Sequence, residues 1–153
     1  MTQATEALVV DASVVVKWHL RDEEDAARAT LLLHRFAQGR LNLLAPDHIR
    51  PEFAAAITKA TPGRKPRLTP SQGTDAIEEF LSLGLRSFET QPLLLPAYGL
   101  AQQFGCAFYD ALYLALSERL SVSLLTADER FYHAVRGHPL VVRMADYSPP
   151  DES

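Results

Sequence analysis

Short strand-like segments alternate with segments of helical periodicity along most of the chain, and this alternation limits the folds that it can adopt. Five segments are predicted to be strands: Ala7–Val10, Leu41–Ala45, Ser87–Gln91, Val122–Thr126 and Leu140–Met144. Parallel strands joined by helices need cover on both faces of the sheet. The sequence therefore predicts an α/β fold, a three-layer α/β/α sandwich with a central, mainly parallel sheet.

The segments between the strands repeat apolar residues at helical spacing, and four of them end at a glycine, a typical helix terminator. The predicted helices are Asp22–Ala37, Ile49–Ala60, Ser71–Leu83, Leu94–Phe104, Tyr109–Leu120 and Glu129–Arg136. Between the second and third helices, Thr61–Pro70 holds three prolines and reads as a loop. Apolar segments continue almost to the C-terminus, so we expect one domain over residues 1–153 with a core at about 7–147.

The chain is slightly acidic, with 15 Lys and Arg against 19 Asp and Glu and a formal charge of -4. Such a balance excludes nucleic-acid binding by bulk charge and requires a local basic patch. The candidates are Lys17, Arg64, Lys65, Arg67 and Arg130. The alternative for each is a solvated surface charge. We expect a cytoplasmic protein with no signal peptide and no membrane span, because the N-terminus lacks a basic region and there is a single cysteine.

Four acids occupy positions where chemistry is plausible. Asp11 and Asp128 follow two apolar strands, and ligands of open parallel sheets bind at that end of the strands. Glu52 and Asp110 lie in helical segments among apolar neighbours. Each acid also has a simpler explanation, as a helix cap or as a first-turn acid favoured by the helix dipole.

If these four acids converge, they form a site made only of oxygen ligands, which suits Mg²⁺ or Mn²⁺ rather than Zn²⁺. Two unit charges about 4 Å apart repel by roughly 4 kcal/mol at an effective dielectric near 20, so the cluster needs cations or bound protons. A metal ion there activates water and stabilises the oxygens of a phosphodiester during hydrolysis. The hypothesis is therefore metal-assisted cleavage of a phosphodiester.

The residues around these acids resemble a known family. Residues 8–18 (LVVDASVVVKW), 51–56 (PEFAAA), 108–115 (FYDALYLA) and 124–131 (LLTADERF) are similar, in this order, to the four acidic motifs of PIN domains. The size and layout resemble the small bacterial toxins of the VapC type. Asp11, Glu52, Asp110 and Asp128 match the acidic quartet of the family, which is catalytic and binds metal. Ser13 and Thr126 match supporting hydroxyl positions.

The resemblance implies an endoribonuclease that uses Mg²⁺, or Mn²⁺ in its place, and a metal-activated water to cut tRNA, rRNA or mRNA. It also implies a homodimer and a cognate antitoxin, with no membrane partner. The alternative is a PIN-like module that binds RNA or protein without catalysis. A phosphoacceptor domain is a third class, but the segment Ser87–Gln91 supplies no strand-end Asp for it.

Overall fold

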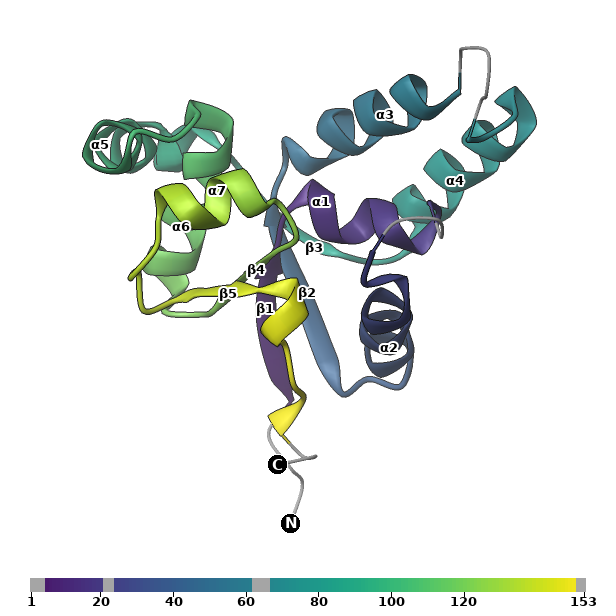
Figure 1. The fold of residues 1–153 in the computed structure, drawn as a ribbon, viewed down its shortest axis with the longest axis horizontal. Coiled ribbons are helices and arrows are strands. Elements are labelled where there is room, and N and C mark those ends of the chain that lie inside the picture. Colours follow the sequence, from purple (N-terminus) through teal and green to yellow (C-terminus); the bar gives the residue numbers. More distant parts are fainter. Residues whose placement is uncertain (1–4, 21–23, 62–66, 151–153) are drawn as a thin grey trace.

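The computed structural model describes residues 5–20, 24–61 and 67–150, and they form five parallel strands with helices on both sides (Figure 1). The strand order is β3-β2-β1-β4-β5, and all four pairings are parallel. The strands are β1 Glu6–Val10, β2 Leu41–Pro46, β3 Arg86–Phe88, β4 Leu124–Thr126 and β5 Val141–Arg143. The predicted α/β/α sandwich is confirmed, and its sheet is wholly parallel.

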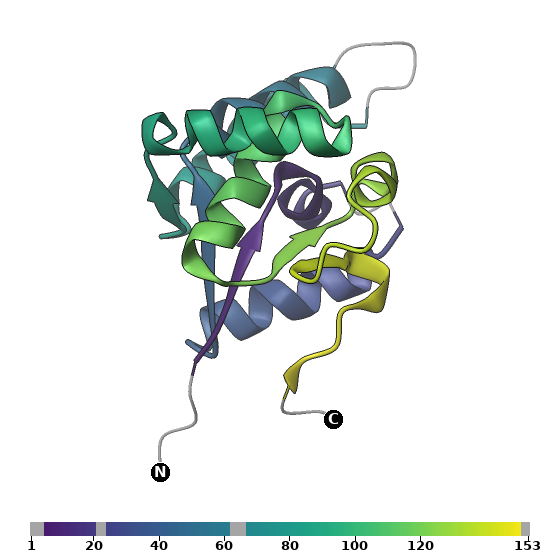
Figure 2. The same ribbon diagram turned by 90° about the vertical axis from the view of Figure 1, so that its left-hand side faces the viewer.

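The helices divide between the two faces of this sheet. Their bounds are α1 Ala12–Val15, α2 Ala26–Ala37, α3 Ile49–Ala60, α4 Pro70–Ser82, α5 Leu94–Phe104, α6 Phe108–Leu120 and α7 Glu129–Ala134. Figure 1 shows α1 to α4 on one side of the sheet and α5 and α6 on the other, and Figure 2 looks from the side of α5 and α6. None of the helices in the described ranges has the length and apolarity needed to cross a membrane.

Helix α6 has the longest run of buried residues among the helices of the described ranges, and its sequence explains why. Seven consecutive residues from Ala111 to Ser117 are buried, because the helix lies between the sheet on one side and α5 on the other. A helix that is apolar all round belongs in such an interior position. This packing holds the first turn of α6, with Asp110, close to the carboxyl ends of the central strands.

Several predicted boundaries are wrong by one to three residues. The segment Ser87–Gln91 is a strand only to Phe88, since Gln91–Leu93 forms a 3-10 turn (η2) at Pro92, which has no N–H for a sheet. Strand β4 begins two residues late, because the Val122 N–H is bonded to the Ser117 carbonyl (3.1 Å). Helix α7 ends two residues early, strand β5 is one residue shorter at each end, and Asp22 lies outside the described residues.

Candidate active site

The carboxyl ends of β1 and β4 form the switch point of the sheet. The chain passes from β1 to β2 and β3 on one side, then crosses back to β4 and β5 on the other. In open parallel sheets this is where ligands bind, because the connections diverge and leave a crevice between the strand ends. Asp11 follows β1 directly and Thr126 is the last residue of β4, so both stand at this point.

A hydroxyl network ties Asp11 to the end of β4. Ser13 Oγ donates to Asp11 Oδ1, and Thr126 Oγ1 donates to Asp11 Oδ2. Each hydroxyl also accepts a backbone N–H: Ser13 from Ala127 at 2.9 Å, and Thr126 from Asp128 at 3.1 Å. Since both hydroxyl protons point at the carboxylate, the network orients the Asp11 side chain and connects β1 and β4 through two residues, Asp11 and Thr126, that are 115 apart in the sequence.

Asp11 is not a helix cap. It stands at the N-cap position of α1, but its side chain makes no capping hydrogen bond, because both carboxylate oxygens face the two hydroxyls. Asp11 is only 4% exposed. Burial raises its pKa to about 6, with smaller contributions from the charges of Asp110 and Asp128, and the two hydroxyl hydrogen bonds only partly oppose this rise.

The hydroxyl of Thr126 gives a first test of this network. Thr126→Val is expected to lower the unfolding free energy at pH 8 by about 1–3 kcal/mol, because it leaves Asp11 Oδ2 and the Asp128 N–H without a partner. Thr126→Ser keeps the hydroxyl and is expected to lose only about 1 kcal/mol, the value of one methyl group. Urea unfolding measures both values, and equal losses would refute a structural role for the hydroxyl.

Asp128 is a helix cap whose charge also acts on the other three acids. Its Oδ1 accepts the Phe131 N–H at 3.1 Å, so it does cap α7. Its charge also raises the pKa values of Asp11, Glu52 and Asp110. A capping carboxylate uses one oxygen for the helix, and the other remains available to the site.

Glu52 and Asp110 face the same region from the first turns of α3 and α6. Burial raises the pKa of Glu52 to about 7, and the charges of Asp11 and Asp110 add to this rise. Burial and the charge of Asp128 raise the pKa of Asp110 to about 6. Every pair among the four acids thus interacts through its charges, so the fold brings all four into one electrostatic neighbourhood.

The donor set fits a hard divalent cation. All four side chains offer carboxylate oxygens, the ligands of Mg²⁺ and Mn²⁺, and their mutual repulsion is relieved by positive charge. Among residues 5–20, 24–61 and 67–150, no three Asp, Glu, His or Cys side chains are arranged to hold a metal ion as they stand. Mg²⁺ keeps several waters and uses one or two carboxylates with substrate phosphate, so a ready-made cage is not required. Joint metal binding by the four acids stays a prediction.

A cavity of about 470 Å³ opens beside Glu52 and Asp110, and His48, Pro51 and Tyr109 complete its lining. The sequence reasoning gave His48 no role, yet its Nε2 is 3.4 Å from Glu52 Oε2. Burial lowers the pKa of His48. The one signal for this pair was the four-residue spacing of His48 and Glu52, which brings two side chains together at the start of a helix.

Tyr113 is a core residue, but its hydroxyl group lies next to the site. It is fully buried, and its hydroxyl lies near Glu52 and the Ala12 backbone without a hydrogen bond of regular geometry. Burial and the Glu52 charge raise the pKa of Tyr113, so the phenol stays neutral. It therefore presents a polar group, but no additional charge, to the carboxylates.

The Lys and Arg side chains proposed to bind RNA differ in their exposure to solvent. Arg130 is exposed in the first turn of α7, and Arg67 is exposed at the edge of the 61–70 segment. Lys17 is only 8% exposed in the 3-10 turn η1 (Val16–Trp18). Arg64 and Lys65 lie outside the described residues.

The aromatic residues near the motifs also differ in their exposure to solvent. Trp18 is buried and its Nε1 donates to the Ala29 carbonyl at 2.6 Å, so it is a structural residue. Tyr109 is 64% exposed at the rim of the cavity that Glu52 and Asp110 line. Of Trp18, Tyr109 and Tyr113, only Tyr109 is therefore open to a base of RNA.

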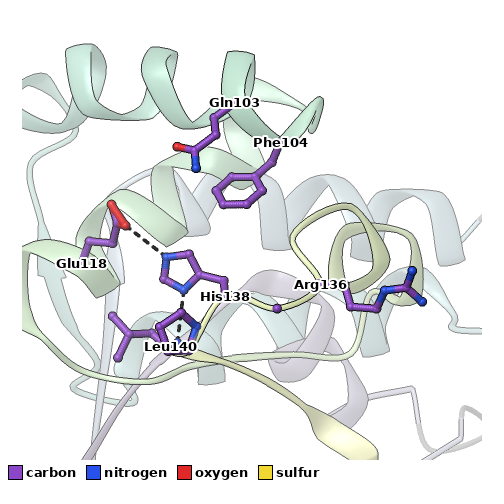
Figure 3. A pocket seen from close by; sticks show the side chains of 8 residues that line it. Gln103, Phe104, Glu118, Arg136, His138 and Leu140 are labelled. Carbon is purple, nitrogen blue, oxygen red and sulfur yellow. Dashed lines mark hydrogen bonds and ion pairs between the residues drawn. The ribbon is translucent and has the colours of Figure 1, made fainter.

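A second pocket of about 650 Å³ lies at the opposite end of α6 (Figure 3). In it His138 Nε2 contacts Glu118 Oε2 at 3.0 Å, and Nδ1 accepts the Leu140 N–H at 3.1 Å. Nε2 thus holds the α7–β5 connection against α6, and Nδ1 accepts a hydrogen bond within that connection. Eight residues separate Glu118 from Asp110 along α6, about 12 Å at 1.5 Å per residue, so this pocket is separate from the acids.

Comparison with known proteins identifies the family. A model of the PIN domain matches residues 8–137, which include all four acids, and the chain belongs to the PIN domain family. Its sequence is similar to Ribonuclease VapC12 of Mycobacterium tuberculosis, with 31% identity over 131 residues that cover 86% of this chain and 93% of the relative. The resemblance to VapC-type toxins seen in the four motifs is thereby confirmed.

Solved structures share the fold. PAE2754 from Pyrobaculum aerophilum superposes with a TM-score of 0.63 at 22% identity, covering 94% of this chain and 93% of that one. A chain of a toxin–antitoxin complex from Klebsiella pneumoniae gives a TM-score of 0.62 at 15% identity, covering 93% of this chain and 99% of that one. At such identities these structures support the fold alone.

Proposed function

We propose that this chain is a metal-dependent endoribonuclease, the toxin component of a type II toxin–antitoxin pair. One observation carries the proposal: in a chain of the PIN domain family, four carboxylates at the switch point of the sheet act on one another through their charges. By resemblance, the same four residues match the acidic motifs of the family. Membership of the family and likeness to a ribonuclease of the VapC type support the reaction class.

In this proposal Asp11, Glu52, Asp110 and Asp128 hold Mg²⁺, with Mn²⁺ as a substitute. When bound, the cation supplies Lewis acidity to the attacking water and to the phosphate oxygens. Ser13 and Thr126 hold the Asp11 carboxylate in place with their hydroxyl protons. The burial of Asp11 keeps competing water away from that carboxylate.

RNA is proposed to approach over the cavity beside Glu52 and Asp110. The exposed ring of Tyr109 suits stacking with a base, and exposed Arg130 suits a phosphate contact. Arg67, Arg64 and Lys65 remain proposed phosphate contacts from the 61–70 segment. Lys17 remains a weaker candidate, because a contact with phosphate would require its buried side chain to move outward.

The proposed partners are RNA, a cognate antitoxin and a second copy of this chain, in the cytoplasm. An antitoxin is proposed because the chain is proposed to be the toxin of a toxin–antitoxin pair. The homodimer is supported by exposed apolar side chains on α5 and at the start of α6, where such a patch marks an interaction surface. These residues are Leu94, Leu95, Tyr98 and Phe108.

The central test is cleavage of end-labelled tRNA and rRNA by the purified chain. We expect cleavage with Mg²⁺ or Mn²⁺, a rate at least about a hundredfold lower in EDTA, and recovery when Mn²⁺ is added in excess, because several kcal/mol of transition-state stabilisation depend on the cation. Equal rates with and without EDTA would refute metal chemistry. Tight RNA binding without turnover in any metal would instead favour the non-catalytic module.

A further inference from the structure

His48 lies between two elements that carry candidate metal ligands. It directly precedes α3, one turn before Glu52, and its imidazole reaches the start of α6. Nε2 is 3.0 Å from the Tyr109 carbonyl oxygen and 3.4 Å from Glu52 Oε2. A carbonyl oxygen only accepts hydrogen bonds, so Nε2 carries a hydrogen and donates it to Tyr109. One N–H therefore faces both the residue before Asp110 and the carboxylate of Glu52.

Packing alone does not account for an imidazole at this position. The side chain is 10% exposed, and its ring centroid lies 4.5 Å from that of Tyr113 and 5.8 Å from that of Tyr109. The other ring nitrogen, Nδ1, is buried and has no hydrogen-bond partner among the described residues. An apolar side chain would fill this space without a buried, unpaired nitrogen. The contact made by Nε2 is therefore the feature that requires histidine.

We infer that His48 is a positioning residue that ties the start of α3 to the start of α6 and so fixes the separation of Glu52 and Asp110. The inference rests on the proposed function, in which these two carboxylates hold one cation. Like charges push the two first turns apart in the absence of that cation. The hydrogen bond to the Tyr109 carbonyl opposes this motion one residue away from Asp110.

Three substitutions distinguish the contribution of the His48 N–H group from that of its ring. His48→Gln places an amide nitrogen near the position of Nε2, His48→Asn places one only as far as Nδ1, and His48→Leu removes all hydrogen bonding. Mn²⁺ affinity of the metal-free protein is measured by titration calorimetry. We expect His48→Gln to stay within about threefold of the wild type, and the Asn and Leu variants to bind about 10–100-fold more weakly, as for other groups that orient metal ligands.

A matched control is available on α7. His133 and Glu129 form a His–Glu pair with the same four-residue spacing at 3.6 Å, but their side chains are 60% and 56% exposed. His133→Leu is expected to leave Mn²⁺ affinity unchanged. RNA cleavage gives a second measurement: the Asn and Leu variants should need more Mn²⁺ for half-maximal rate and should keep the KM for RNA.

Two results would overturn this inference and leave the proposed function intact. The first is wild-type Mn²⁺ affinity in the Asn and Leu variants, even if their melting temperatures fall. The second is an equal loss in the Gln and Leu variants, which would assign the effect to the ring rather than to the N–H. If the wild-type protein takes up no Mn²⁺, the proposed function fails and this inference fails with it.

Discussion

Asp11→Asn is expected to reduce RNA cleavage at least about a hundredfold and, at the same time, to make the metal-free protein more stable at pH 8. The amide keeps the size of the side chain but removes the charge that the proposed cation requires. With a pKa raised from 3.8 to about 6, the ionised Asp11 costs about 3 kcal/mol relative to the unfolded chain. The amide avoids that cost.

Part of this gain is lost again, because Ser13 and Thr126 both donate to Asp11 and an amide can accept on one side only. The net increase in the unfolding free energy is expected to be about 1–2 kcal/mol, since one mismatched hydrogen bond costs about 1–2 kcal/mol. Urea unfolding in EDTA and cleavage in Mg²⁺ measure the two effects. Opposite changes in activity and stability distinguish a functional charge from a structural one.

Asp47→Asn is the matched control for this experiment. Asp47 follows β2 as Asp11 follows β1, but its side chain is 47% exposed and pairs with Arg50 at 3.1 Å. We expect cleavage by this variant to stay close to that of the wild type. An Asp11→Asn protein that cleaves RNA normally would remove Asp11 from the chemistry, and one that is inactive but unfolded would attribute the loss to the fold.

The sequence placed the four acids correctly on their elements, because that placement depends on local patterns. An apolar run followed by Asp predicts a strand end, and parallel strand ends meet at one edge of the sheet. The hydrogen bond between Thr126 and Asp11 joins residues 115 apart, and local periodicity carries no information about such a pairing. Only the resemblance to PIN domains linked the two positions before the fold was known.

The same reasoning could not separate the roles of Asp11 and Asp128. Both precede helices after apolar strands, and both satisfy the pattern of an N-cap. In the fold, Asp128 caps α7, whereas the hydroxyls of Ser13 and Thr126 draw the Asp11 carboxylate away from the helix. His48 was missed for a related reason: its decisive partner is the Tyr109 carbonyl, 61 residues further along the chain.

The stability of the metal-free protein is expected to fall as the pH rises from about 4 to about 7. In the folded state the pKa values of Asp11 and Asp110 are raised from 3.8 to about 6, and that of Glu52 from 4.5 to about 7. The folded protein therefore binds more protons than the unfolded chain over this range. Because the slope of unfolding free energy with pH follows the difference in bound protons, stability decreases until all three groups are ionised.

Mn²⁺ is expected to reverse this loss above pH 7 and to have little effect at pH 5. The cation requires the ionised carboxylates, so protons compete with it at low pH and no longer do so at pH 8. At a free concentration of 100 Kd the gain is about 2.7 kcal/mol. Melting temperatures at pH 5, 6.5 and 8, in EDTA and in Mn²⁺, measure both effects, with Asp11→Asn as the control that should remove the Asp11 share of the pH-dependent loss and weaken the Mn²⁺ shift. A Mn²⁺ shift of equal size at pH 5 and pH 8 would contradict binding through these carboxylates, because only groups that titrate between those values make the gain depend on pH.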